Sequence, residues 1–181
     1  MKLKHIQLFA VVVLAGLIIT SCKKKEDDVE EEENITTVKV TLTPVTGGTA
    51  QTFTWKDVDG PGGNAPVIDQ IVLAASIPST CSLQFLDESK TPAADITPEI
   101  IAEGKDHQVY YEATGVSVTV NTLNNDANGL PLGNTSFWGN SGTGTGSMKI
   151  TLKHKPGTKA AGDPVTKGET DIEVVFPVKI Q

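Results

Sequence analysis

Alternation of apolar and polar residues is the feature that most constrains the fold of this chain. Val38, Val40 and Leu42 are separated by single polar residues, a spacing typical of a β-strand with one buried face. The same alternation, or a short apolar run in its place, recurs in further segments: 52–55, 67–75, 80–85, 107–112, 116–121, 148–152 and 172–178. Strands do not alternate with helices anywhere, so the pattern excludes a doubly wound α/β fold.

Turn-forming residues separate these segments. Gly47-Gly48 and Thr114-Gly115 could each close a hairpin, and a polar loop occupies 124–129. About eight strands across 34–181 predict an all-β fold, an antiparallel β-sandwich of the immunoglobulin-like or Greek-key kind. One segment departs from this pattern, because the residues of 97–104 start with threonine and proline and end with glycine. They predict a short helix with Thr97 as its N-cap.

The start of the chain differs from the rest. A stretch over 6–19 is almost wholly apolar but is shorter than the about 20 residues of a membrane span, so residues 1–21 are predicted to be a signal peptide. It ends in Ile19-Thr20-Ser21-Cys22, which resembles the lipobox of bacterial lipoproteins. The resemblance implies cleavage before Cys22 and acylation of its thiol, with palmitate among the acyl chains. An uncleaved N-terminal anchor is the alternative.

An acidic segment follows Cys22. Residues 23–33 contain three lysines, seven acidic residues and one apolar residue, too little apolar surface to bury. We therefore expect residues 22–33 to be the lipidated cysteine with a disordered tether, and residues 34–181 to form a single domain. Acidic residues directly after a lipidated cysteine resemble the export signal of surface lipoproteins in Bacteroidota. The resemblance implies a lipid-anchored protein of the outer membrane that faces the cell exterior; a plain spacer is the alternative.

The mature chain also resembles a group of small Bacteroidota surface lipoproteins. The resemblance depends on the residues of 87–92, 106–108 and 168–174. Similar chains are sometimes catalogued in the type 1 periplasmic binding fold superfamily. That fold has two α/β lobes, which a chain so rich in strands cannot build. The resemblance therefore implies a location and an all-β domain more than an activity.

Two histidines follow the signal peptide, and each lies near the end of a predicted strand. Glu103 and Asp106 accompany His107, whereas lysines flank His154. Imidazole with carboxylate is a ligand set suited to zinc or copper. The candidate metal ligands are His107, His154, Asp106 and Glu103. Their convergence requires the two strands to be neighbours; otherwise these are unrelated surface histidines.

The segment after residue 56 offers a second candidate cation site. Asp57, Asp59 and Asn64 surround glycines, and oxygen ligands at alternate positions of a tight loop are how calcium loops are built. The full pattern fails, because Pro61 and Ile68 occupy two of its ligand positions. A plain turn rich in Asp and Gly is the alternative.

Three further residues are singled out by their surroundings. Phe137 and Trp138 lie in a polar, glycine-flanked region, where an exposed indole could stack on a sugar or contact a partner. Packing in the core is the alternative for both. Cys81 lies on the apolar face of its strand and, with Cys22 acylated, is predicted to be a buried free thiol.

The composition narrows the possible functions. A net charge of -7 without arginine argues against binding to nucleic acid. No Gly-x-Ser-x-Gly or His-Glu-x-x-His motif is present, so we expect no catalysis and no required cofactor. We expect a non-catalytic lipoprotein that captures a ligand or assists an outer-membrane receptor of the TonB-dependent type, in a setting related to metal uptake. A glycan-binding surface module and a structural envelope lipoprotein without a small ligand are the alternatives.

Overall fold

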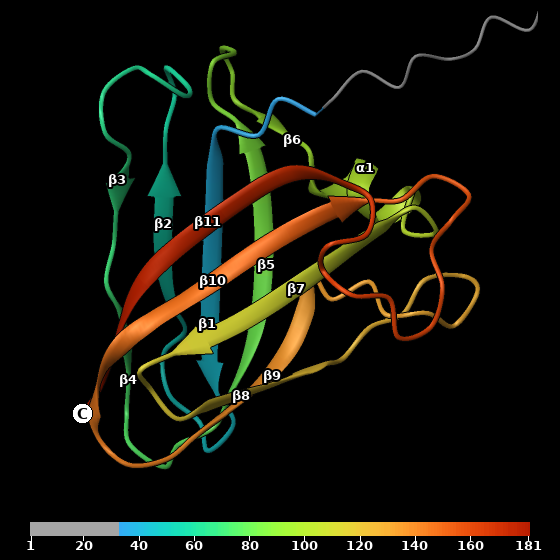
Figure 1. Ribbon diagram of the computed structural model, residues 1–181. Helices are drawn as coiled ribbons and strands as arrows, with labels where there is room; N and C mark the ends of the chain where they lie inside the picture. The colour runs from blue at the N-terminus through green and yellow to red at the C-terminus, as the bar shows by residue number, and fades with distance from the viewer. Residues whose placement is uncertain (1–32) are drawn as a thin grey trace, which may run out of the picture. The chain divides into compact units, whose positions relative to one another are not determined.

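The computed structural model describes residues 33–181, which form two stacked β-sheets (Figure 1). The first sheet contains β1 (Thr37–Pro44), β2 (Gln51–Lys56), β3 (Val67–Ile68), β5 (Ser79–Asp87), β6 (Ala94–Asp95), β8 (Val118–Thr122) and β9 (Thr135–Asn140). The second sheet contains β4 (Ile71–Leu73), β7 (His107–Thr114), β10 (Gly144–His154) and β11 (Glu169–Ile180). A short helix, α1 (Thr97–Ala102), follows β6.

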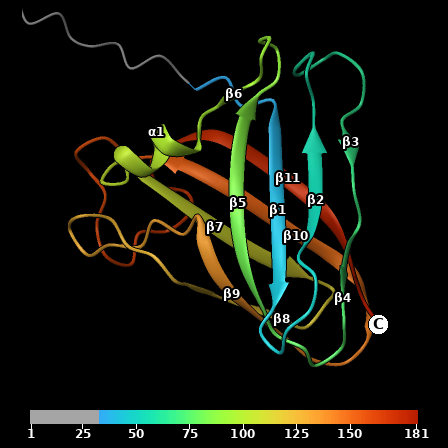
Figure 2. The ribbon, with the colours of Figure 1, turned by 180° about the vertical axis from the view of Figure 1, so that it is seen from behind.

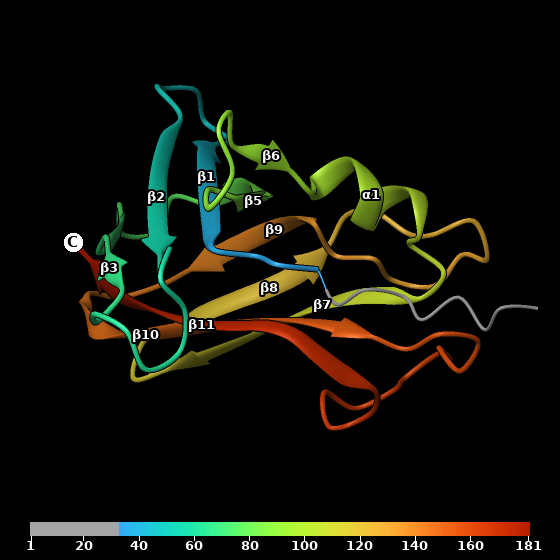
Figure 3. The same cartoon turned by 90° about the horizontal axis from the view of Figure 1, so that it is seen from above.

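The strand order shows that the chain changes sheet several times. The first sheet has the order β3-β2-β1-β5-β9-β8, with β6 beside β5, and the second has the order β4-β11-β10-β7. Figure 2 shows the first sheet in front of the second, and Figure 3 shows the two layers edge-on. The predicted all-β sandwich is confirmed. The predicted signal peptide, Cys22 and all but the last residue of the predicted tether lie outside the described residues.

The core lies between the sheets and is built from the alternating apolar residues. Val38 and Val40 of β1 are fully buried, as are Phe176 and Val178 of β11. Each such side chain contributes about 1.5–3 kcal/mol on burial, so the two facing rows hold the layers together. Cys81 is buried and has no disulfide partner among residues 33–181, which confirms the predicted free thiol.

Three predictions about the strands are wrong in detail. The run over 67–75 is not one interior strand. It divides into β3 at the edge of the first sheet, where Val67 is 72% exposed, and β4 at the edge of the second. β4 pairs parallel to β11, so the sandwich is not purely antiparallel. Thr114-Gly115 closes no hairpin, because β7 and β8 lie in different sheets.

The helix is shorter than the predicted segment 97–104, and its cap differs. Its N-cap residue is Ile96, without a side-chain cap. The hydroxyl of Thr97 instead accepts a hydrogen bond from the backbone N–H of Phe85 at 2.9 Å and so attaches the helix to β5. The backbone N–H of Thr97 donates to Asp95 at 3.0 Å. Within residues 33–181, no helix has the length and apolar character to cross a membrane.

Candidate metal site

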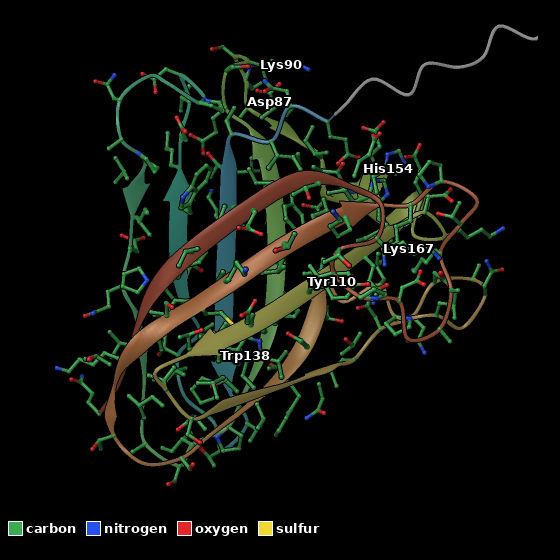
Figure 4. All side chains as sticks on the ribbon, viewed as in Figure 1. Asp87, Lys90, Tyr110, Trp138, His154 and Lys167 are labelled. Atoms are coloured by element: carbon green, nitrogen blue, oxygen red, sulfur yellow. The ribbon has the colours of Figure 1, made fainter. Side chains whose placement is uncertain are left out.

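The two histidines face each other across a strand pair. β7 and β10 are antiparallel neighbours, and their register places His107 directly opposite His154, so the side chains share one face of the sheet. The rings are stacked, with centroids 4.7 Å apart and an angle of 12° between their planes. Figure 4 shows His154 where β10 ends, at the end of the sandwich where α1 lies. The two strands are therefore neighbours, which is the condition that the sequence set for a site shared by both histidines.

The histidine pair continues the row of core residues at one end of the sandwich. The neighbouring pair on the same face of the two strands is Val109 of β7 and Leu152 of β10, and both are buried. His107 itself is 1% exposed. Burial, together with the neighbouring His154 ring, lowers the pKa of His107 to about 4, so its imidazole is neutral at pH 7. The neutral ring is the form that binds metals.

The hydrogen bond of His107 fixes which ring nitrogen is available. Its Nδ1 lies 3.2 Å from the backbone oxygen of Glu103, and because a carbonyl oxygen can only accept, Nδ1 carries the hydrogen. The Nε2 atom therefore presents a lone pair. It faces Asp171 Oδ2 at 3.7 Å and Glu33 Oε1 at 3.8 Å. Carboxyl oxygens of two acidic residues thus lie near this nitrogen.

A β-bulge places Asp171 in this group. Leu152 pairs with Ile172 and Lys153 with Thr170, so Asp171 is one extra residue in β11. A bulge redirects the side chain of the extra residue, and the Asp171 side chain is 6% exposed. Simple alternation from the inward-facing Ile172 would turn Asp171 to the outside, which is why the sequence pattern missed it.

Glu33, counted with the tether in the sequence analysis, belongs to the folded part. Its side chain is 12% exposed, and both carboxylate oxygens are buried without a hydrogen bond to any described residue. Burial, then the nearby acidic residues Asp171, Glu99 and Glu103, raise the pKa of Glu33 to about 8. The acidic run around Glu33 gave no sign that its last member is buried.

The other two predicted metal ligands have different positions. Glu103, Glu33 and His107 place their ligand atoms within 4.8 Å of one another, as do His107, His154 and Asp171. Asp106 belongs to neither group. Its carboxylate accepts the backbone N–H of Gly157 at 2.8 Å and thereby holds the loop after β10. Of the four predicted ligands, Asp106 is therefore the one that lies outside both groups.

The candidate calcium loop has the geometry of a plain turn. The carboxylate of Asp57 accepts the N–H of Gly60 at 3.0 Å. That of Asp59 accepts the backbone and side-chain amides of Asn64 at 2.9 and 2.7 Å. Among the described residues, no third His, Cys or acidic side chain groups with the two aspartates. The hydrogen bonds close the turn, so the loop needs no cation to explain its acidic residues.

Trp138 offers no face to a ligand. It is 0% exposed, its indole N–H donates to Ser136 Oγ at 2.9 Å, and its ring packs edge-on against Tyr111. Phe137 is half-buried on β9. The expected exposure of Trp138 is therefore wrong, and the glycan-binding alternative loses the residue on which it depended.

Comparisons with protein-family models, with curated proteins and with solved structures found no match to this chain. The functional argument therefore depends on the group formed by His107, His154, Asp171, Glu33 and Glu103, which we call the histidine cluster.

Proposed function

We propose that this protein is a non-catalytic outer-membrane lipoprotein that captures a divalent transition-metal ion, Zn²⁺ or Cu²⁺, for an uptake receptor. The observation that carries the proposal is the convergence of His107, His154 and Asp171, whose ligand atoms lie within 4.8 Å of one another, with His107 Nε2 3.7 Å from Asp171 Oδ2. A cation can bind between such groups, because it attracts the lone pairs of the imidazole nitrogens and of the carboxylate oxygen alike. Imidazole and carboxylate together are a ligand set for zinc and copper.

The cluster offers more than one set of ligand atoms for a captured ion. His107, His154 and Asp171 supply the nearest set of ligand atoms, and Glu33 and Glu103 extend it. The two imidazole rings are nearly parallel, so we expect them to tilt when they share one ion. The proposal that the protein is not an enzyme rests on its sequence, which contains no Gly-x-Ser-x-Gly or His-Glu-x-x-His motif.

The N-terminal pattern supports the location. Signal peptide, lipobox cysteine and acidic segment together favour a lipid anchor, and each buried methylene of its acyl chains contributes about 0.8 kcal/mol to membrane binding. Labelled palmitate should enter the wild-type protein but not Cys22→Ala. Protease added to intact cells should remove the domain; complete protection would favour a periplasmic position.

Metal binding can be measured on a soluble chain that begins at Lys23. Residues 32–181 form a compact unit that contains the described core, so this chain should fold. Calorimetric titration with ZnCl₂ or CuCl₂ should give one ion per chain with a micromolar or tighter Kd. Asp171→Asn should weaken binding by about 10–100-fold, and His154→Ala by at least as much.

Asp106→Asn is the matched control, because it removes a carboxylate next to His107 that lies outside the cluster and keeps the oxygen that accepts from Gly157. It should leave the affinity unchanged. Absence of binding by the wild-type chain would refute metal capture, as would equal losses in Asp106→Asn and Asp171→Asn.

A further inference from the structure

A cleft of about 490 Å³ lies beside the histidine cluster. Its walls come from both sheets: residues 34–36, which precede β1, Trp55 near the end of β2, the loop 57–61, and residues 170–173 of β11. Asp171 belongs to both the cleft and the cluster, and Asn34 of the cleft directly follows Glu33. A ligand in the cleft can therefore reach an ion held by the cluster.

The charge of the cleft is of one sign. Its ionisable lining residues are Asp57, Asp59, Asp171 and Glu173, and no lysine or histidine lines it. Hydrogen bonds from the backbone and side chain of Asn64 lower the pKa of Asp59, which keeps this carboxylate ionised at neutral pH. A cleft lined by carboxylates concentrates cations and repels anions.

The cleft also has an apolar wall, which a bare metal ion does not need. Trp55 lies opposite the inward-facing Val38 in the register of β1 and β2 and is half-buried, with Ile172 and Val58 on the same lining. An ion with about six waters, at about 30 Å³ each, would fill less than half of the cleft. Both size and lining therefore fit a cation with an organic part.

We propose that the captured species is a cationic metal chelate, in which the ion in the histidine cluster still carries a small organic ligand that lies against Trp55. This inference rests on the proposed metal capture. The carboxylates of the cleft favour the net positive charge of the complex. The indole face accommodates a planar or apolar ligand and attracts a cationic one.

The test compares Cu²⁺ alone with the preformed 1:1 complex of Cu²⁺ and 2,2′-bipyridine on the chain from Lys23. The complex is a dication with a planar ligand and open coordination positions. Calorimetry should show that Trp55→Ala weakens binding of the complex by about 10-fold and changes the affinity for Cu²⁺ by less than 2-fold. Trp55→Leu keeps apolar bulk without the aromatic face, and it should likewise weaken binding of the complex and leave the affinity for Cu²⁺ unchanged. Phe137 lies outside the cleft, so Phe137→Ala should change neither affinity.

Three results would overturn the chelate proposal. One is an unchanged affinity for the complex in both Trp55 variants. Another is an equal loss for the complex and for Cu²⁺ in Trp55→Leu. The third is recovery of free bipyridine in the filtrate, because the protein would then strip the metal from its ligand. If the wild-type chain binds neither Cu²⁺ nor Zn²⁺, both the metal-capture proposal and the chelate proposal are refuted. If it binds these ions normally and any of the three results is found, only the chelate proposal is refuted.

Discussion

Gly168 occupies a position near the candidate site that other residues would disturb. Its φ is +81°, in the left-handed region, and a Cβ atom there would lie 2.3 Å from the backbone oxygen of His154. Glycine alone tolerates both conditions without strain. His154 is the last residue of β10, and Gly168 directly precedes β11, which contains the bulged Asp171. The contact between Gly168 and His154 therefore fixes the end of β10 against the start of β11, and with them the positions of two proposed ligands.

We expect Gly168→Ala to lower the free energy of unfolding by about 1–3 kcal/mol through backbone strain and the clash, and to weaken zinc binding. Urea denaturation measures the first effect and calorimetry the second. Gly162→Ala is the matched control: its φ is +75°, but the added Cβ meets open space. Equal effects of the two substitutions would show that the approach to His154 has no role.

The second residue-scale prediction concerns Cys81. Burial raises the pKa of its thiol to about 12, so at pH 8 only about one molecule in 10⁴ carries the reactive thiolate. In the chain from Lys23, which lacks Cys22, a thiol reagent at pH 8 should react only after unfolding in urea. Rapid reaction of the native protein would contradict the buried, protonated thiol.

At the residue scale, the sequence predicted some of the site. Two histidines at strand ends beside acidic residues were sufficient to suggest His107, His154 and Glu103. Asp171 could not be predicted, because a bulge breaks the alternation that sequence patterns follow. Glu33 could not either, since burial of one acid in an acidic run depends on the tertiary fold.

At the scale of elements, buried ion pairs fasten the loop 155–168, which connects His154 to β11. Lys159 Nζ lies 2.8 Å from Asp126 Oδ2 and 2.7 Å from the backbone oxygen of Gly104, and the lysine and aspartate side chains are 1% and 0% exposed. Burial alone would raise the pKa of Asp126, but hydrogen bonds from Lys159 and from backbone N–H groups lower it. The Asp126 carboxylate is therefore ionised at neutral pH.

We expect Asp126→Asn to cost about 3–5 kcal/mol in the free energy of unfolding, because it leaves the Lys159 ammonium buried without its counter-charge. Asp126→Asn with Lys159→Met should cost less than the single change, which a double-mutant cycle measures. Lys149→Met, which breaks a partly exposed pair with Glu112, should cost about 0–1 kcal/mol. Additive losses in the cycle would refute direct coupling of the buried pair.

The sequence predicted elements well where one face of a strand is buried and less well elsewhere. The alternation of β1, β5, β10 and β11 gave their positions. The run over 67–75 was misassigned, since apolar side chains on two sheet edges look like one interior strand. β9 was missed because its glycine-flanked residues resemble a loop, although Trp138 lies fully in the core.

At the scale of the whole molecule, the histidine cluster lies where the two sheets meet at one end of the core. Glu33 precedes β1 of the first sheet, whereas His107, His154 and Asp171 belong to the second. These residues converge because of how the strands pair within each sheet, which the sequence does not specify. An ion bound there would join the sheets, so its binding free energy should add to the stability of the fold.

We therefore expect Zn²⁺ at about 100 times its Kd to stabilise the chain from Lys23 by about 2.7 kcal/mol. For a domain of this size, that gain corresponds to a rise in Tm of about 5–10 °C. Thermal unfolding followed by circular dichroism, with and without ZnCl₂, measures the shift. His154→Ala should remove it and Asp106→Asn should keep it, because only the first residue belongs to the cluster. A shift of equal size in both variants would mean that zinc stabilises the protein elsewhere, and no shift in the wild-type chain would contradict binding between the sheets.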